Sequence, residues 1–228
     1  MNAPARSRRL VVVLVAMALG ASAGAAVPDP ADQSIRQFLA QDGTQPPYRA
    51  VRRLEAWNGS RSAWMEAVTA YSQSAGFRYE ITAEGGSDSI RNRVLRAMLD
   101  GEREIIAVGE SARSALAREN YTFQPKGIGA DGLANIQLTP RRKERVLVSG
   151  TMLLRPRGGD LVRLEGRLAK SPSFWVKNVD IVRIYERING VVVPVRLESQ
   201  AQVRFLGEAT LRMTYRYSEV AGRAVKLR

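Results

Sequence analysis

Residues 161–199 read LVRLEGRL (161–168), VDIVRIYER (179–187), NG (189–190) and VVVPVRLES (191–199). These segments are rich in β-branched and aromatic residues, and charges recur at every second or third position. That pattern is typical of strands with one buried side and one solvent-facing side. Asn189 and Gly190 supply the two positive-φ residues of a tight type I′ hairpin, which sets the strand register. The stretch therefore predicts long antiparallel strands, which the rest of the chain extends or covers.

Strand patterns recur on both sides of this hairpin. We expect further strands at residues 48–57, 62–72, 77–83, 121–124, 133–138, 146–155, 201–205 and 209–218. Turn residues separate most of them at hairpin distance, which gives about ten strands joined mainly as a meander. No period of about 20 to 50 residues repeats, so solenoids and propellers are excluded.

Two regions show helical spacing of apolar residues instead. One short amphipathic helix is expected at residues 29–41. A longer insert begins after Gly85-Gly86, with Ser87 or Asp88 as its cap, and a second helical stretch covers residues 102–118. The apolar stripe of the first insert helix consists of Ile90, Val94, Ala97 and Met98. A helical insert between strands predicts helices on one face of an antiparallel sheet, an α+β fold that is mostly β.

The amino-terminal segment has the composition of a secretory signal peptide. Residues 1–9 are basic, residues 10–19 are apolar, and small residues follow through Ala26. The apolar run is shorter than the roughly 20 residues that span a bilayer, although an uncleaved anchor is the alternative interpretation. We therefore expect a signal peptide at residues 1–26 and one mature domain at residues 27–228, located in the periplasm.

The chain is strongly basic. Its formal net charge is +13, and the predicted leader contributes three of these charges, which leaves 13 − 3 = +10 on the mature part. Such a charge favours anionic partners such as lipid headgroups, although a basic, arginine-rich proteome gives the same excess. Basic residues alternate with apolar ones along the whole chain, which argues against a nucleic-acid site. The basic turn at residues 140–145 is either a solvated hairpin tip or a headgroup contact.

The composition excludes several kinds of chemistry. The chain has no His and no Cys, so thiol nucleophiles and Ser-His triads are absent and a zinc site is not expected. Glu165, Asp180, Glu186 and Glu198 each stand near an Arg or Lys, and pairing across the sheet surface is expected. A glycosidase-type carboxylate pair depends on distances in space and stays open.

One glycine motif does not support dinucleotide binding. Residues 127–132 match G-x-G-x-x-G but precede a strand pattern, whereas dinucleotide binding requires a following helix. From the composition and these motifs, we predict no enzymatic activity of a common hydrolytic class, no cofactor and no metal.

Three segments carry a resemblance to a known family. They are LAKSPSFWVK (168–177), YERINGVVVPV (185–195) and LRMTYRY (211–217). With the order of the elements, they resemble exported bacterial proteins similar to the periplasmic carriers and receptors of the outer-membrane lipoprotein-sorting (Lol) system. The resemblance implies an unclosed β-barrel, a strongly curved antiparallel sheet whose concave face is covered by a helical lid over a cavity for lipoprotein acyl chains. It assigns no gating arginine, and the absence of Cys fits the soluble carrier form.

Two hypotheses on function remain open. In the first, a monomeric carrier holds acyl chains of lipids or lipoproteins in an apolar cavity, with anionic headgroups or envelope proteins as further partners. In the second, the sheet is filled by its own side chains and the domain is an envelope interaction or stress-sensing module, as related regulatory domains imply. An open volume of about 300 to 1,000 Å³ beneath the helices would distinguish them.

Strand and helix periods select the side chains that share the predicted cavity face, and each of them is alternatively ordinary core. The candidate ligand-binding residues are Phe77, Tyr79, Ile81, Ile90, Val94, Met98, Met152, Leu154, Leu211, Met213 and Tyr215.

Overall fold

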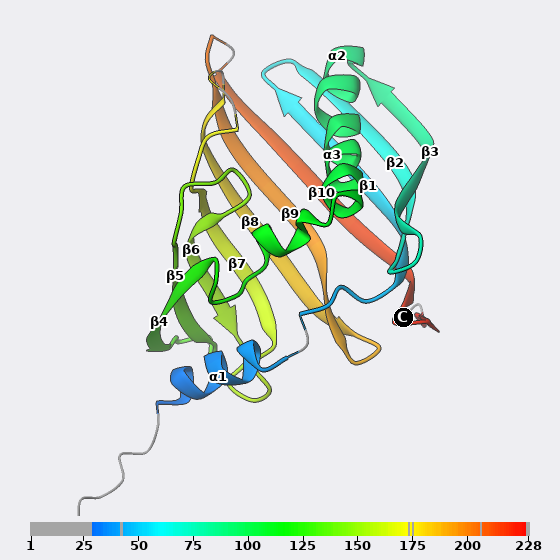
Figure 1. The fold of residues 1–228 in the computed structure, drawn as a ribbon. Helices are drawn as coiled ribbons and strands as arrows, with labels where there is room; N and C mark the ends of the chain where they lie inside the picture. The colour runs from blue at the N-terminus through cyan, green and yellow to red at the C-terminus, as the bar shows by residue number, and fades with distance from the viewer. Residues whose placement is uncertain (1–28, 42, 173, 175, 206, 227–228) are drawn as a thin grey trace, which may run out of the picture.

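The computed structural model describes residues 29–41, 43–172, 174, 176–205 and 207–226. The predicted signal peptide lies outside the described residues. The described chain forms a curved antiparallel sheet with helices on one face (Figure 1). Its strands are β1 (Tyr48–Asn58), β2 (Arg61–Ser72), β3 (Gly76–Gly86), β4 (Tyr121–Ile128), β5 (Ala134–Pro140), β6 (Val148–Leu154), β7 (Leu161–Leu168), β8 (Val176–Ile188), β9 (Val191–Val203), β10 (Gly207–Val220) and β11 (Arg223–Ala224).

The strand order explains why the sheet stays open. Across the sheet the order is β3-β2-β1-β10-β9-β8-β7-β6-β5-β4, with β11 paired to β10. The first three strands therefore run outward to one edge, and the helical insert carries the chain to the opposite edge at β4. Hairpins then lead back until β10 pairs with β1. No pairing between the edge strands β3 and β4 occurs in the described chain, so the mostly-β, unclosed fold class predicted from the sequence is confirmed.

The predicted hairpin at Asn189-Gly190 is confirmed. Asn189 has φ +51° and Gly190 has φ +90°, and the turn joins the long strands β8 and β9. The Asn189 side-chain amide also donates to the backbone carbonyls of Val220, at 3.2 Å, and Arg223, at 2.9 Å. These bonds attach the hairpin tip to the β10–β11 turn.

The helices cover the two halves of the concave face separately (Figure 1). Helix α1 (Pro30–Leu39) is capped by Asp29, whose carboxylate accepts from the backbone N–H of Ala31 at 2.9 Å. The insert consists of α2 (Asp88–Ile90), a π-helical segment η1 (Arg91–Arg96) and α3 (Ala97–Ala107) in direct succession. A 3₁₀ turn, η2 (Glu110–Ser114), follows.

The structure corrects two predictions about this insert. The second helical stretch does not continue to residue 118 but ends at Ala107, because Gly109 adopts φ +71°. Val94 was placed on the inward stripe, yet it is 38% exposed, whereas Leu95 and Leu99 are fully buried. The π-helical segment hydrogen-bonds from i to i+5 and so rotates the following residues away from the regular 3.6-residue period.

The apolar core consists of two main clusters, one under the α2–α3 insert and one under α1. The first core lies between the α2–α3 insert and strands β1, β2, β3 and β10, and it includes Leu54, Met65, Leu95, Leu99 and Met213. The second core lies between α1 and strands β4 to β7. It includes Ile35, Ile136, Met152, Leu154 and Leu164. Strands β8 and β9 connect the two: Val193 belongs to the first core and Leu197 packs against it, and Tyr185 and Val192 pack against the second.

Two glycines allow close approach of β6 and β7. Gly150 and Gly166 are direct partners in the register. A Cβ atom on Gly150 would lie 2.0 Å from the carbonyl oxygen of Glu165, and one on Gly166 would lie 2.2 Å from that of Ser149. Only glycine fits both positions without moving backbone.

We predict that Gly150→Ala lowers the free energy of unfolding by about 2 kcal/mol or more, because the obstructing atoms belong to backbone. Urea unfolding of the purified mature domain measures the effect. Gly101→Ala in α3 is the matched control, since nothing lies within 4 Å of its added Cβ. That control should be neutral or stabilising by up to about 1 kcal/mol. Equal stability of the two variants would contradict the prediction.

Candidate functional site

A row of paired side chains crosses the concave face from one core to the other. Each member stands directly opposite the next on neighbouring strands. In order from β5 to β2, this central row consists of Ile136, Met152, Leu164, Arg183, Leu197, Met213, Leu54 and Met65. Its two ends belong to the second and the first core. Arg183 is the polar exception in an otherwise apolar row.

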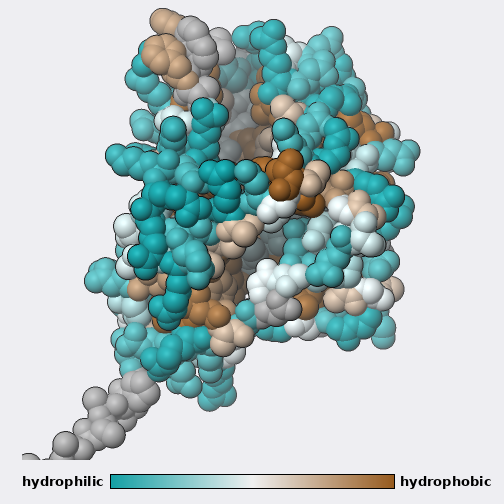
Figure 2. All heavy atoms as spheres, in the orientation of Figure 1, coloured by the Kyte–Doolittle hydropathy of each residue, from teal (hydrophilic) through white to brown (hydrophobic). Residues whose placement is uncertain are grey.

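The middle of this row lies in an open trough. Arg183 and Leu197 are half-buried, whereas Leu164 and Met213 on either side are only 3% exposed. Figure 2 shows the molecule hollowed between the half that carries the α2–α3 insert and the half that carries β4 to β6, with apolar atoms at the margins of the hollow. We call this hollow, with β8 and β9 as its floor, the trough.

Small residues add depth to the trough. The row next to the central one runs from β5 to β2 as Leu138, Gly150, Gly166, Ile181, Ser199, Leu211, Ala56 and Ala63. Short side chains leave space above the backbone, because each Cβ projects from the pleat but carries little beyond it. The apolar floor continues beyond this row in a third cluster built on Val148, Val179 and Ile181.

Polar contacts fasten the insert over the first core. The buried guanidinium of Arg52, 2% exposed, donates to both carboxylate oxygens of Glu102 on α3, at 2.5 and 2.9 Å. It also donates to the Tyr48 hydroxyl at 2.5 Å and lies 4.8 Å from the centre of the Tyr215 ring. Burial acts to lower the pKa of Arg52, but the hydrogen bonds to Glu102 and the charges of Tyr215, Glu102 and Tyr48 together outweigh it, and the pKa is raised. Arg52 is therefore a permanent charge inside the core.

Two weaker contacts act beside this pair. The Tyr79 hydroxyl donates to Asp100 at 2.7 Å, and Arg96 donates to Glu84 at 3.0 Å. The insert is thus held to β1 and β3 by charged and polar groups as well as by Leu95 and Leu99.

Arg183 has a different environment. No carboxylate of the described chain forms an ion pair with it. Its pKa is raised by the neighbouring Tyr185 first, against the effect of burial, with further contributions from Tyr215 and Glu102. Burial also raises the pKa of Tyr215, so that phenol is neutral at neutral pH. Arg52 and Arg183 are thus both charged on the concave face, and Glu102 is a carboxylate that acts on both.

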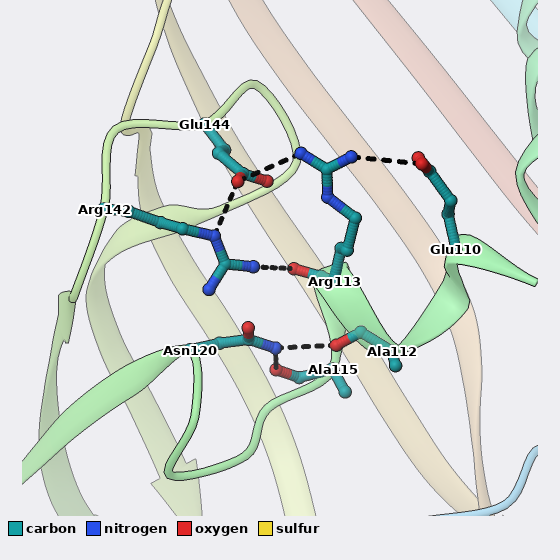
Figure 3. Close-up of polar contacts among 7 residues, drawn as sticks. All are labelled: Glu110, Ala112, Arg113, Ala115, Asn120, Arg142 and Glu144. Carbon is teal, nitrogen blue, oxygen red and sulfur yellow. Dashed lines mark hydrogen bonds and ion pairs between the residues drawn. The ribbon is translucent and has the colours of Figure 1, made fainter.

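A connecting segment bridges the two covers. Residues 108–120, which we call the strap, run from α3 to β4 and pass in front of β8 and β9 in Figure 1. Leu116 of the strap packs against the second core. The Asn120 side-chain amide donates to the carbonyls of Ala112 and Ala115, at 2.8 and 2.7 Å, and holds the strap in its turn (Figure 3).

The basic turn at residues 140–145 fastens the strap to the sheet (Figure 3). Glu144 accepts from Arg113 of the strap at 3.1 Å and from Arg142 at 2.6 Å, and Arg142 also donates to the Arg113 carbonyl at 3.2 Å. Hydrogen bonds from Arg113, followed by those from Arg142, lower the pKa of Glu144. Part of the basic charge of this turn is therefore engaged inside the protein.

The structure groups most of the candidate residues but not all of them. Phe77, Leu211 and Met213 are buried in the first core, and Tyr79, Ile81, Ile90, Met98 and Tyr215 pack against it. Met152 and Leu154 belong instead to the second core, under α1. Val94 is exposed, as noted above.

Sequence reasoning missed Arg52, Glu102, Arg183 and Leu197. A signal for both arginines was present: Arg52 stands between Ala50 and Leu54, and Arg183 between Ile181 and Tyr185, so each occupies an inward position of its strand.

Two pockets of the described chain lie away from the insert. One of about 340 Å³ is found at the ends of β7 to β9, where Arg187 donates to Asp160 at 2.6 Å. The other, of about 220 Å³, lies at the ends of β1 to β3 beside Tyr48 and Tyr71. The side chains beneath α3 pack against one another as core. The trough, rather than a closed cavity under the helices, is therefore the candidate site.

The expected surface pairs are present for three of the four acids. Arg163 pairs with Glu165 at 2.7 Å, Arg167 with Asp180 at 2.8 Å, and Glu198 with Arg212 at 2.9 Å. Within the described ranges, no group of three or more acidic side chains is placed to hold a metal ion. No helix among the described residues is long and apolar enough to cross a membrane.

Comparison with known proteins gives distant structural similarity. No protein-family model matches this chain, and no curated protein matches it significantly. A LolA superfamily protein from Nitrosomonas europaea is similar with a TM-score of 0.40 and 10% identity, over 87% of this chain and 93% of that one. A DUF1329 family protein from Desulfovibrio piger is similar with a TM-score of 0.38 and 10% identity, over 82% of this chain and 90% of that one. Similarity this distant concerns the course of the backbone alone.

The Arg52–Glu102 pair gives a direct prediction about stability. Glu102→Leu should lower the free energy of unfolding by about 3 kcal/mol, because it leaves a buried guanidinium without its partner. The double variant Arg52→Met/Glu102→Leu should be more stable than the Glu102→Leu single variant, since apolar replacement of both partners removes the uncompensated charge.

Urea unfolding of the Glu102→Leu and Arg52→Met/Glu102→Leu variants measures both free energies of unfolding. Arg53→Met is the matched control, since Arg53 is the next residue on β1 and pairs with Glu66 at 3.2 Å on the solvent side. Its loss should be within about 1 kcal/mol. A loss below about 1 kcal/mol for Glu102→Leu would show that the pair does not hold α3 to the sheet.

Proposed function

We propose that this protein binds the acyl chains of lipids or lipoproteins in the trough. The observation that carries the proposal is the divided core: two apolar clusters have separate covers, and Leu197, at the margin of the first, and Ser199 stay half-buried. Filling this gap with the protein's own side chains would join the two cores into one. An acyl chain laid over the floor would bury the same apolar surface, at about 0.8 kcal/mol per CH₂.

The covers are suited to a ligand that enters and leaves. Whereas the insert also buries Leu95 and Leu99, the strap is attached through the ion pairs of Glu144 with Arg113 and Arg142. Such contacts can exchange with water more readily than interdigitated apolar side chains do. Opening at the strap would expose the trough without unfolding the sheet.

The proposed location is the periplasm. Its support is the basic, apolar and small-residue order of residues 1–26, which is typical of a cleaved export signal. Intact-mass measurement of the protein recovered from a periplasmic fraction should give a chain that begins near Val27. A full-length chain in the membrane fraction would contradict the location.

The second candidate function is an envelope interaction module without a ligand. It is favoured by the packing beneath α3, where the predicted cavity residues contact one another. The two functions make opposite predictions for lipid binding.

The test is binding of an uncharged fluorescent probe, N-phenyl-1-naphthylamine, and its displacement by monoacylglycerols of increasing chain length. Affinity should rise by up to about fourfold for each added CH₂ until the trough is filled. Ser199→Phe, which occupies the floor, should weaken binding tenfold or more at full stability. Gln200→Phe is the matched control, because the exposed Gln200 is the next residue of β9 and faces the opposite side.

Absence of probe binding by the wild-type protein would overturn the carrier proposal and favour the interaction module. Equal loss of binding in Ser199→Phe and Gln200→Phe would place the site elsewhere.

A further inference from the structure

We propose that the trough selects amphiphiles with an anionic headgroup, a carboxylate or a phosphate, and that Arg183 is the residue that binds it. The inference rests on the proposed function and specifies the ligand class. It starts from the register: Arg183 stands opposite Leu164 on β7 and opposite Leu197 on β9, at the centre of the apolar central row.

An apolar residue at this position would continue the row and join the two cores. Arginine opposes this, because its guanidinium stays protonated at any physiological pH and its burial is unfavourable without an anionic partner. The nearby carboxylate, Glu102, already accepts from Arg52 through both oxygens. Arg183 is thus a permanent charge on an apolar floor, without an ion-pair partner in the described chain.

The surroundings fit the two ends of an amphiphile. A guanidinium offers paired N–H donors that match a carboxylate or phosphate in bidentate geometry. Tyr215 lies near enough to Arg183 for each to affect the titration of the other, and its neutral hydroxyl provides an additional donor. Beyond Arg183 along β8, Ile181 and Val179 form a buried apolar cluster with Val148. The headgroup would lie at Arg183 and the acyl chain would lie against this cluster.

Several other arginines of the described chain are engaged with acids elsewhere. Arg187 pairs with Asp160 in the 340 Å³ pocket, and Arg113 and Arg142 share Glu144 at the strap. The arginines of the opposite face, such as Arg212 and Arg163, pair with Glu198 and Glu165. Arg183 therefore combines a central position in the apolar row with a charge that has no ion-pair partner in the described chain.

The experiment compares ligands of one chain length by displacement of N-phenyl-1-naphthylamine. The ligands are dodecanoate and dodecyl phosphate, with 1-dodecanol as the uncharged reference, all below their critical micelle concentrations. We expect the wild-type protein to bind at least one anion about tenfold or more tightly than the alcohol. The tighter of the two anions identifies the headgroup.

The variants assign the preference to a residue. Arg183→Met should bind the three ligands with similar affinity, and Arg183→Lys should keep part of the preference. Arg216→Met is the matched control: it removes the same charge from the exposed, opposite face of β10 and should leave the preference unchanged.

Measurement of the wild type at pH 4 provides a check that needs no variant. Dodecanoate is then largely protonated and should lose most of its advantage, because alkyl carboxyl groups titrate near this pH. Dodecyl phosphate keeps one negative charge and should keep its affinity.

Three results would overturn the inference. Equal wild-type affinity for anions and alcohol, or an anion preference that persists in Arg183→Met, would exclude Arg183 as the headgroup site while the proposed function stands. Failure of all ligands, including the alcohol and the neutral probe, would overturn both.

Discussion

The open edge of the sheet is the constraint on which the rest of this structure depends. The edge strands β3 and β4 do not pair in the described chain, so the concave face cannot be enclosed by strands alone. Helices must cover it, and the connectivity places one helix at each side: α1 over β4 to β7, and α3 over β1 to β3. Two covers on a wide curved sheet produce two cores with a gap between them. The trough is the direct consequence.

The two arginines of the concave face differ in role: Arg52 holds the insert to the sheet, and Arg183 is the proposed headgroup site. Arg52 and Arg183 both project from inward strand positions, but of the two only Arg52 forms an ion pair among the described residues, with Glu102. A matched buried pair can hold two elements together even where it adds little net stability. An unmatched guanidinium on an apolar floor is unfavourable for folding, and such exceptions to local consistency are expected at functional sites.

The covers and the floor differ in the forces that hold them. The floor is a continuous antiparallel ladder from β10 to β5, with paired glycines where β6 and β7 approach most closely. The strap is fastened by side-chain hydrogen bonds at Glu144, whereas the insert also buries Leu95 and Leu99 in the first core. Segments with fewer buried apolar contacts open at lower free energy than the core strands. Ligand exchange through the strap therefore agrees with the distribution of contacts, and the sheet can stay intact.

The sequence by itself determined the antiparallel sheet, the Asn189-Gly190 turn, the insert between strands and the surface ion pairs. These features depend on neighbours in the chain, through strand alternation and turn chemistry, and local patterns record them. Only the tertiary structure decided that Met152 and Val94 lie away from the first core, and that Arg183 faces the trough without an ion-pair partner in the described chain. Those outcomes depend on strand order across the whole sheet and on a π-helical segment, and neither follows from a local pattern.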